Sequence, residues 1–243
     1  MTHDAHQART QIDPQQAFDE LGQMVLGEHT MEHLLQRIVA LAMDVIPGAE
    51  DVSVTVVNTR RATTVVSTGR LATELDESQY DTGFGPCLAA AEGGEVASIP
   101  EMESETRWPA FTKAAVERGV LSSLSTPIPL QQYASAALNI YATRPKAFDE
   151  AAVELATSFA GYAGVALANM HLYESTRALA EQLQAAMESR AVIEQAKGIL
   201  MGQRRCSADE AFDLLVRLSQ QANRKLRDVA QALVDQSMKP TPA

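Results

Sequence analysis

One helical pattern dominates the C-terminal half of the sequence and limits the folds that the chain can adopt. Residues 147–190 have helical periodicity, and Asp149 is the expected N-cap. From Val165 onward, apolar residues recur at every seventh position, which is the spacing of one edge of a coiled coil. These positions are Val165, Leu172, Leu179, Ala186, Ile193 and Leu200. We therefore expect a long helix that supports a parallel homodimer or packs on a neighbouring domain.

The companion positions of this stripe are small or polar. They are Ala168, Ser175, Gln182, Ser189 and Ala196. A long helix that only covers its own sheet is the alternative interpretation. It does not explain why the stripe continues beyond the strand-forming part of the chain.

Before the long helix, strand-like and helix-like segments alternate. Thr30 is the expected N-cap of a helix that ends at Pro47-Gly48, and a turn at 59–61 predicts a β-hairpin. The expected strands are 52–58, 63–68, 96–99, 121–130 and 133–143, and the expected shorter helices are 15–26, 30–46, 71–80, 81–95 and 107–119. This order predicts an α+β fold, in which helices flank both faces of an antiparallel sheet.

Three helices are expected at the C-terminal end. The first is the end of the long helix, with Gly202 as its left-handed stop. Ser207 and Glu210 form a capping box for the second helix, and Asn223 is the expected N-cap of the third. A bundle of about 50 residues is marginal alone, so its stability depends on the long helix or on dimerisation.

The net charge of −11 is unevenly distributed. Residues 1–185 carry 11 Lys and Arg against 24 Asp and Glu, whereas residues 186–243 carry 9 against 7. The slightly basic C-terminal segment is therefore where an anionic partner would dock. The alternative is that these cations only solvate the outer faces of helices.

The composition argues against several classes of protein. Only two cysteines are present, Cys87 and Cys206, which argues against a disulfide scaffold and fits a reducing cytoplasm. Residues 1–14 are polar, are expected to be disordered and lack the apolar core of a secretion signal. We find no stretch of about 20 apolar residues that would predict a membrane span.

The sequence contains no catalytic or metal-binding arrangement that the residues support. His29 and His33 lie one helical turn apart, but a third zinc ligand is not evident. Cys87 follows Gly85-Pro86 and is either a reactive thiol at a helix N-terminus or, as we expect, a buried packing residue. We therefore expect no enzymatic activity, no cofactor and no metal.

Short motifs in the first two thirds of the chain resemble bacterial sensory GAF domains, over about residues 20–170. The residues that carry the resemblance are Gly83-Phe84-Gly85-Pro86-Cys87, Ile99-Pro100, Arg107-Trp108-Pro109-Ala110-Phe111, Leu138-Asn139-Ile140-Tyr141 and Ala147-Phe148-Asp149-Glu150. The resemblance implies a sensor at 15–170 that binds a small molecule or serves as a dimerising module. The signature of the cyclic-nucleotide subset is not reproduced. The expected ligand-binding residues are Phe84, Cys87, Trp108, Phe111 and Tyr141.

The C-terminal segment resembles an ANTAR domain, over about residues 180–237. The match is dense at Ser189-Arg190, at 193–201, at Asp209-Glu210-Ala211-Phe212, and at Asn223-Arg224-Lys225-Leu226. ANTAR domains bind RNA in transcription antitermination, and a dimer is expected to grip two small stem-loops. The resemblance and the charges imply an RNA surface at Arg190, Gln195, Lys197, Gly198, Arg204, Arg205, Ser219, Arg224, Lys225 and Arg227.

The sequence as a whole therefore predicts an RNA-binding antitermination regulator with a GAF sensor, a homodimer located in the cytoplasm. The expected order after the sensor is a connecting coiled-coil helix at 171–185, an RNA-binding three-helix domain at 186–237 and a tail at 238–243, preceded by a disordered N-terminus at 1–14. A DNA-binding helix-turn-helix in the same C-terminal segment is the alternative.

Gly198 interrupts the long helix at a cost of about 1 kcal/mol relative to alanine. Because it has no side chain, it can let a second helix or an RNA backbone come close. We expect Gly198→Leu to disrupt the RNA-binding module by steric clash.

Overall fold

The computed structural model describes residues 12–24, 27–58, 61–130 and 135–238, and it divides into two compact units. The first unit comprises Met1–Tyr173 and the second Glu174–Ala243. Residues 59–60 of the expected turn at 59–61, the expected disorder of residues 1–11 and most of the expected tail lie outside the described residues. Arg61, the last residue of the expected turn, is instead the first residue of a strand. Asp13 and Pro14 were expected to be disordered, but Asp13 caps the first helix and Pro14 begins it.

The first unit is built on a five-stranded sheet in which every neighbouring pair is antiparallel. Its strand order is β2-β1-β5-β4-β3. The strands are β1 (Asp51–Asn58), β2 (Arg61–Ser67), β3 (Ala97–Ile99), β4 (Ser122–Ile128) and β5 (Ser135–Ala142). The predicted α+β class, with an antiparallel sheet flanked by helices, is confirmed.

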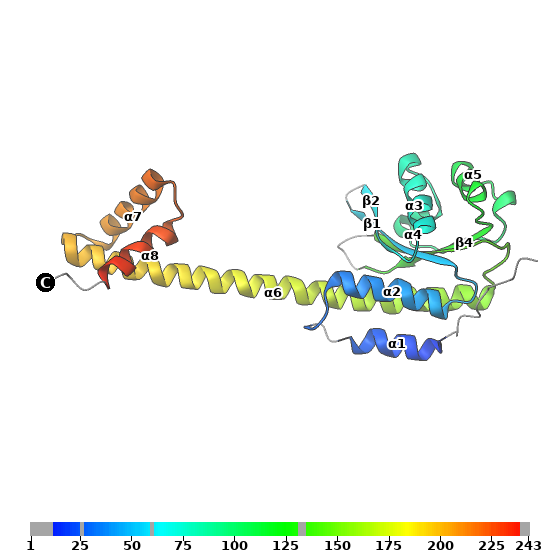
Figure 1. The fold of residues 1–243 in the computed structure, drawn as a ribbon, viewed down its shortest axis with the longest axis horizontal. Helices are drawn as coiled ribbons and strands as arrows, with labels where there is room; N and C mark the ends of the chain where they lie inside the picture. The colour runs from blue at the N-terminus through cyan, green and yellow to red at the C-terminus, as the bar shows by residue number, and fades with distance from the viewer. Residues whose placement is uncertain (1–11, 25–26, 59–60, 131–134, 239–243) are drawn as a thin grey trace, which may run out of the picture. The chain divides into compact units, whose positions relative to one another are not determined.

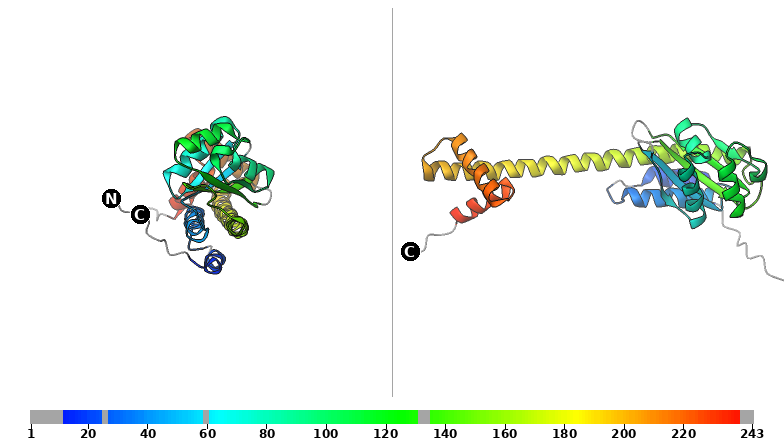
Figure 2. Two further views of the ribbon diagram at one scale, coloured as in Figure 1. Left: turned by 90° about the vertical axis from the view of Figure 1, so that its right-hand side faces the viewer. Right: turned by 90° about the horizontal axis from the view of Figure 1, so that it is seen from above.

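Helices cover both faces of this sheet (Figure 1). They are α1 (Pro14–Gln23), α2 (Met31–Val45), α3 (Arg70–Thr82), α4 (Pro86–Gly93), the short 3₁₀ turn η1 (Met102–Ser104), α5 (Pro109–Glu117) and the start of α6 (Glu150–Arg204). Helices α2 and α6 run side by side along one face, whereas α3, α4 and α5 lie over the other, and α1 packs outside α2 and α6 (Figure 2). Phe18 of α1 stacks on Tyr162 of α6, with ring centroids 4.5 Å apart.

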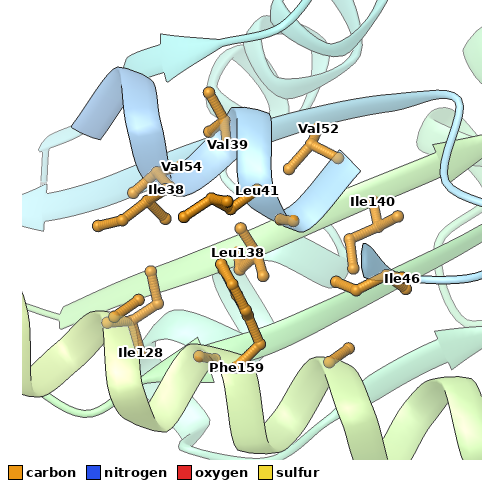
Figure 3. Packing of buried hydrophobic residues seen from close by; sticks show 14 of the residues in the cluster. Ile38, Val39, Leu41, Ile46, Val52, Val54, Ile128, Leu138, Ile140 and Phe159 are labelled. Atoms are coloured by element: carbon orange, nitrogen blue, oxygen red, sulfur yellow. The ribbon is translucent and has the colours of Figure 1, made fainter. Parts of the chain in front are cut away.

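The two faces of the sheet differ in chemistry because side chains alternate along each strand. Val52 and Val54 of β1 point toward α2 and α6, where they join Leu138, Ile140 and many others in the larger apolar core (Figure 3). The opposite face of the same strand carries Asp51, Ser53 and Thr55, all buried. One face of the sheet is therefore apolar and the other is rich in polar groups.

The predicted helix starts are confirmed where a side chain supplies the cap. The Thr30 hydroxyl accepts a hydrogen bond from the backbone amide of His33. The Asp149 carboxylate accepts one from the backbone amide of Ala152 at 2.8 Å.

Helix α3 begins differently, because its N-cap residue is Gly69. The Asp51 carboxylate reaches across from β1 and accepts the amide of Ala72 at 2.9 Å. A Cβ on Gly69 would lie 2.6 Å from that carboxylate, so the glycine allows a neighbouring strand to cap the helix.

The second unit contains the end of α6, then α7 (Ala208–Ala222) and α8 (Leu226–Ser237). The predicted capping box between Ser207 and Glu210 is confirmed in both of its hydrogen bonds. A small core of alanine, leucine and valine holds the three helices together. Its buried residues are Ala196, Leu200, Ala211, Leu215, Ala230 and Val234.

Two predicted helix boundaries in this unit were wrong. Gly202 does not stop α6, which continues to Arg204, and Arg205 instead takes the left-handed conformation with a φ of 53°. Asn223 does not begin α8. It is the left-handed C-cap of α7, with a φ of 49°, and Lys225 is the N-cap of α8. Asparagine suits both kinds of cap, and a capping preference alone does not tell a helix end from a helix start.

The seven-residue stripe on α6 is exposed in its first part and buried near its C-terminal end. Val165, Leu172 and Leu179 are 61%, 64% and 57% exposed, whereas Leu200 is buried in the core of the second unit. Tyr162 and Leu183 are also exposed, and together with the stripe they recur at intervals of three, four or seven residues. The first part of the stripe is therefore an apolar surface with the spacing of a helix–helix seam.

Among the described residues, helix α6 is long and apolar enough to cross a membrane by length and composition alone, a test that buried core helices also pass. Its apolar residues have another explanation, because Ala156, Phe159, Ala160 and Ala163 are buried in the core of the first unit.

The turn between α3 and α4 yields a first prediction. A Cβ on Gly85 would collide with the side chain of Gln79, which is buried and accepts the amide of Cys87 at 2.9 Å. We expect Gly85→Ala to lower the free energy of unfolding by about 1–3 kcal/mol, because this hydrogen bond has to break or move.

The matched control is Gly161→Ala, in which the new Cβ meets nothing within 4 Å inside α6. That variant should be about as stable as wild type or up to about 1 kcal/mol more stable. Urea unfolding of the three proteins measures both effects. Equal stability of the two variants would contradict the packing described for Gly85.

Candidate functional site

The residues expected to bind a ligand in the first unit separate into a buried group and a surface group. Cys87, Phe111 and Tyr141 are buried in one apolar cluster under α4 and α5. Phe84 is 59% exposed on the link between α3 and α4, and its ring lies 6.4 Å from that of Trp108. The structure therefore does not bring all five residues to one surface.

Trp108 joins these two groups. It is nearly buried, and the guanidinium of Arg107 lies 4.3 Å from its ring centroid. Arg107 is fixed by the carboxylate of Glu105 and by the carbonyl of Ser98, to which it donates at 2.7 Å. Trp108 thus packs under an ordered cation and an exposed aromatic ring at the edge of the domain.

A buried polar network occupies the sheet face beneath α3. At its centre is Asp76 of α3, whose side chain is fully buried. Its carboxylate accepts hydrogen bonds from Ser53 and Tyr141 at 2.6 Å each, from Thr64 at 2.9 Å and from Asn139 at 3.3 Å. These donors come from three strands, β1, β2 and β5, so the network ties α3 to the middle of the sheet.

The network extends through hydroxyl groups. The Tyr80 hydroxyl lies 2.8 Å from both Thr55 and Thr64, and the Asn139 amide donates to Thr55 at 2.9 Å. Asp76, Thr64, Tyr80, Thr55 and Asn139 therefore form a closed ring of hydrogen bonds. Sequence reasoning missed this ring, although the alternation of valine with serine and threonine in β1 marks its polar side.

Burial of this network shifts its titrating groups. Loss of solvent raises the pKa of Asp76 to about 6, against the opposing effect of its hydrogen bonds. Burial, and next the nearby Asp76 carboxylate, raise the pKa of the Cys87 thiol well above its usual value. Cys87 is therefore a packing residue with little thiolate character, as the sequence favoured.

The two histidines of the sequence motif lie beside a shallow cleft of about 800 Å³ between α1 and α2. The rings of His29 and His33 stack, with centroids 4.7 Å apart. Within the described ranges, no group of three histidine, cysteine or acidic side chains is arranged to hold a metal ion.

The residues expected to bind RNA all lie in the second unit, and most are exposed. Arg190, Gln195, Gly198 and Arg204 lie on α6, Arg205 lies in the turn after it, and Arg224, Lys225 and Arg227 lie at the start of α8 or just before it. Arg190 and Arg204 have no ion-pair partner among the residues that the structure describes.

Two of the expected contacts are engaged within the unit itself. The ammonium of Lys197 contacts both carboxylate oxygens of Glu194 at 3.0 Å, and the Lys197 side chain is only 17% exposed. The Ser219 hydroxyl donates to the carbonyl of Arg224 at 2.5 Å and helps close the turn between α7 and α8.

Gly198 lies on an exposed part of α6, where an added Cβ would meet nothing within 4 Å. The same is true of Gly202, one turn further along. The described part of the chain therefore contains no internal clash that would exclude a β-carbon at Gly198. The expected effect of Gly198→Leu depends on the close approach of a second helix or an RNA backbone, and it stays a prediction.

Two protein-family models match this chain. A GAF domain model matches residues 28–168, which is more than half of the chain. This chain belongs to the GAF family. An ANTAR domain model matches residues 181–234, so the chain combines a GAF domain with an ANTAR domain. Both families are regulatory or sensory, and the chain is therefore a regulator with a sensor domain.

Solved structures of low sequence identity are similar to this chain. The chromophore-binding domain of a bacteriophytochrome from R. palustris is 10% identical with a TM-score of 0.50, and the match covers 66% of this chain and 61% of that one. The GAF domain of an Acinetobacter phosphoenolpyruvate-protein phosphotransferase is 15% identical (TM-score 0.47; 65% and 92% covered). At these identities the likeness shows only the fold.

A third similar structure is that of a reductase. A type II free methionine-R-sulfoxide reductase from Thermoplasma acidophilum is 13% identical, with a TM-score of 0.45 and with 58% of this chain and 94% of that chain covered. The comparison with curated proteins found no match.

The two cysteines give a prediction that tests the burial of the GAF core. Cys87 is fully buried, whereas Cys206 of the ANTAR domain is half-buried. We expect an aromatic disulfide reagent to modify Cys206 in the folded protein and to reach Cys87 only after unfolding in denaturant, because both access and thiolate formation are suppressed at Cys87. The variant Cys206→Ser leaves Cys87 as the only thiol, so the rate at which the reagent modifies Cys87 can be measured by itself. Equally fast modification of both thiols in the native protein would contradict this packing.

Proposed function

We propose that this chain is an RNA-binding regulator of transcription antitermination, in which the GAF domain controls an ANTAR domain that binds paired RNA stem-loops. The observation that carries the proposal is the ANTAR match at residues 181–234. It falls in the C-terminal part of the chain, where residues 186–243 carry 9 Lys and Arg against 7 Asp and Glu, whereas residues 1–185 carry 11 against 24. A protein of this charge gains little from nonspecific attraction to polyanions, so binding has to be local to that segment.

The proposed RNA surface combines exposed cations from two elements. Arg204 ends α6 and Arg205 follows it in the turn, whereas Arg224 and Lys225 precede the first turn of α8, where the helix dipole also favours phosphate. Single-stranded loops are recognised by cations on phosphates and by hydrogen bonds to splayed bases. Gln195 offers an exposed amide for the second role.

Lys197 takes part in this surface on one condition. Its ammonium is paired with Glu194, so an RNA phosphate has to replace that carboxylate. The exchange costs little, because an ion pair near the surface contributes only about 0–1 kcal/mol. Ser219 contributes through the α7–α8 turn that its hydroxyl holds closed.

The proposed assembly is a homodimer in the cytoplasm. The exposed apolar residues of α6 at Tyr162, Val165, Leu172, Leu179 and Leu183 form the seam, because two copies of a helix with this spacing bury each other's apolar side chains. The proposed divisions are a sensor at 15–170, a connecting coiled-coil helix at 171–185 and an RNA-binding domain at 186–237. A dimer provides two RNA modules, which matches a pair of stem-loops.

The GAF domain in this proposal is a sensor without enzymatic activity. The exposed Phe84 and the Trp108 beneath it offer a surface for a small molecule or a partner, whereas Cys87, Phe111 and Tyr141 act from the core by setting the shape of that region. A sensor of this kind acts by shifting the population of conformations that the RNA module samples.

A binding experiment tests the RNA proposal directly. We expect the full-length protein to bind a tandem-hairpin RNA and to bind duplex DNA of equal length much more weakly at the same salt concentration. The double variant Arg204→Gln/Arg224→Gln should lose about tenfold or more in affinity, and the slope of log K against log salt should fall by about 1 for each phosphate contact removed.

The control removes the same charge elsewhere. Arg70→Gln/Arg177→Gln changes two cations outside the ANTAR match, on α3 and on α6. It should leave the affinity and the salt slope almost unchanged. Preferential binding of duplex DNA would favour the helix-turn-helix alternative, and equal effects of the two double variants would count against a local RNA surface.

Gly198 gives a second test, in which stability and binding move in opposite directions. Because an added Cβ meets nothing inside the chain, Gly198→Ala should raise the stability of the ANTAR domain by about 1 kcal/mol. If the bare backbone is a place where RNA approaches closely, the same variant should bind tandem-hairpin RNA more weakly.

Thermal unfolding and RNA titration of one preparation measure both quantities. Gly202→Ala is the matched control for the added methyl group, because a Cβ at Gly202 also meets nothing within 4 Å. Unchanged RNA affinity in Gly198→Ala would show that the glycine is only tolerated and is not part of the binding surface.

A further inference from the structure

The buried carboxylate of Asp76 has an unusual set of partners for a charged group. All four groups that donate to it are uncharged: two aliphatic hydroxyls, a phenol and an amide. Among the residues that the structure describes, no lysine, arginine or histidine contacts it. A fully buried anion without a cation is costly, because neutral hydrogen bonds replace only part of its lost hydration.

The other ionisable groups around Asp76 are also acids. They are Asp51 on β1, Tyr80 on the same helix, Cys87 on α4 and Tyr141 on β5. None of them supplies a positive charge, and the Asp51 carboxylate adds to the repulsion. The surroundings on every side therefore favour the neutral form of Asp76, and burial raises its pKa toward the physiological range.

The hydrogen-bonded ring is arranged so that a proton can enter and be accommodated. Thr64 and Tyr80 are only partly buried, so the chain Asp76–Thr64–Tyr80 connects the buried carboxylate with the domain surface. A hydroxyl can donate or accept, so Thr64, Tyr80 and Thr55 can point their protons toward an ionised Asp76 or away from a neutral one. The orientation of the chain is thus set by the charge of Asp76.

We propose that Asp76 is a proton-binding site of the GAF domain, and that binding of one proton reverses the donor direction of the hydroxyl chain formed by Thr64, Tyr80 and Thr55. In the ionised form these groups donate toward the carboxylate. In the neutral form the new carboxyl proton is donated to Thr64, and Thr64 in turn donates to Tyr80. The proton comes from solvent, and the net charge of the site changes from −1 to zero.

This change in hydrogen bonding affects the helix and the strands that form the polar face of the GAF domain. The ring joins α3 to β1, β2 and β5, so each form holds the helix on the sheet with a different set of donors. Proton binding at Asp76 would be a signal for the sensor in the proposed function, but it is measured through the stability and the titration of the GAF domain itself. Failure of RNA binding would therefore leave it standing, and its own failure would leave RNA binding untouched.

The direction of the pH effect follows from the raised pKa. The folded protein holds the Asp76 proton more tightly than the unfolded chain does, so this site stabilises the fold most below about pH 4. The contribution is lost as the pH rises through about 6. Asp76→Asn imitates the neutral form, since its amide donates where the carboxyl proton would.

The test compares full-length wild type, Asp76→Asn and the control Glu77→Gln, which removes an exposed carboxylate from the same helix. From pH 4.5 to pH 7.5, the ratio of the wild-type folding constant to that of Asp76→Asn should fall by a factor of about 25, because the folded pKa is about 6 and the unfolded pKa about 3.9. The corresponding ratio for Glu77→Gln should stay nearly constant. Parallel curves for wild type and Asp76→Asn would overturn the proposal.

A second measurement does not depend on the variant folding well. Wild-type protein labelled with ¹³C at aspartate carboxyl groups should show one buried carboxyl resonance titrating near pH 6, and the Tyr80 ring resonances should shift with the same midpoint. A carboxyl that titrates at pH 4 or below, or tyrosine resonances that do not follow it, would exclude the coupled proton site.

Discussion

The pairing of β1 with β5 at the centre of the sheet is the interaction on which the GAF domain depends. Val54 lies opposite Leu138 and Ser53 opposite Asn139, so the same register serves both faces. On one face these strands bury valine, leucine and isoleucine against α2 and α6. On the other they hold Ser53, Asn139 and Tyr141, three of the four hydrogen-bond donors to Asp76. A slip of one residue would place hydroxyls and a carboxamide in the apolar core, and this strongly fixes the register.

Helix α6 contributes residues to the hydrophobic cores of both domains. Its first turns are part of the GAF core, and its last turns supply Ala196 and Leu200 to the ANTAR core. A helix propagates regular hydrogen bonding along its whole length, so one element can serve two cores. Between those cores the helix leaves leucines exposed. Within the proposed function, that exposed segment is where a second chain would pack.

Much of the secondary structure was predictable because its causes are local. Thr30, Asp149 and the Ser207–Glu210 box mark helix starts, and the β-branched run at 52–58 marks a strand, each within a few residues of sequence. The errors have one kind of origin. Gly202 and Asn223 are compatible with several local conformations, and contacts between α6, α7 and α8 select among them. The cap of α3 was not predictable, since it is a carboxylate that comes from another strand.

The sequence by itself determined the two families, the antiparallel sheet flanked by helices, and the location of the cations in the C-terminal segment, because motifs, alternation and charge are written along the chain. Only the tertiary structure decided which polar residues meet. Ser53, Thr64, Asp76 and Asn139 are spread over more than 80 positions and converge through strand pairing. It also decided that Lys197 is paired and that Gly198 is unobstructed. These facts depend on distances in space, which hydrophobic burial sets for the whole fold at once.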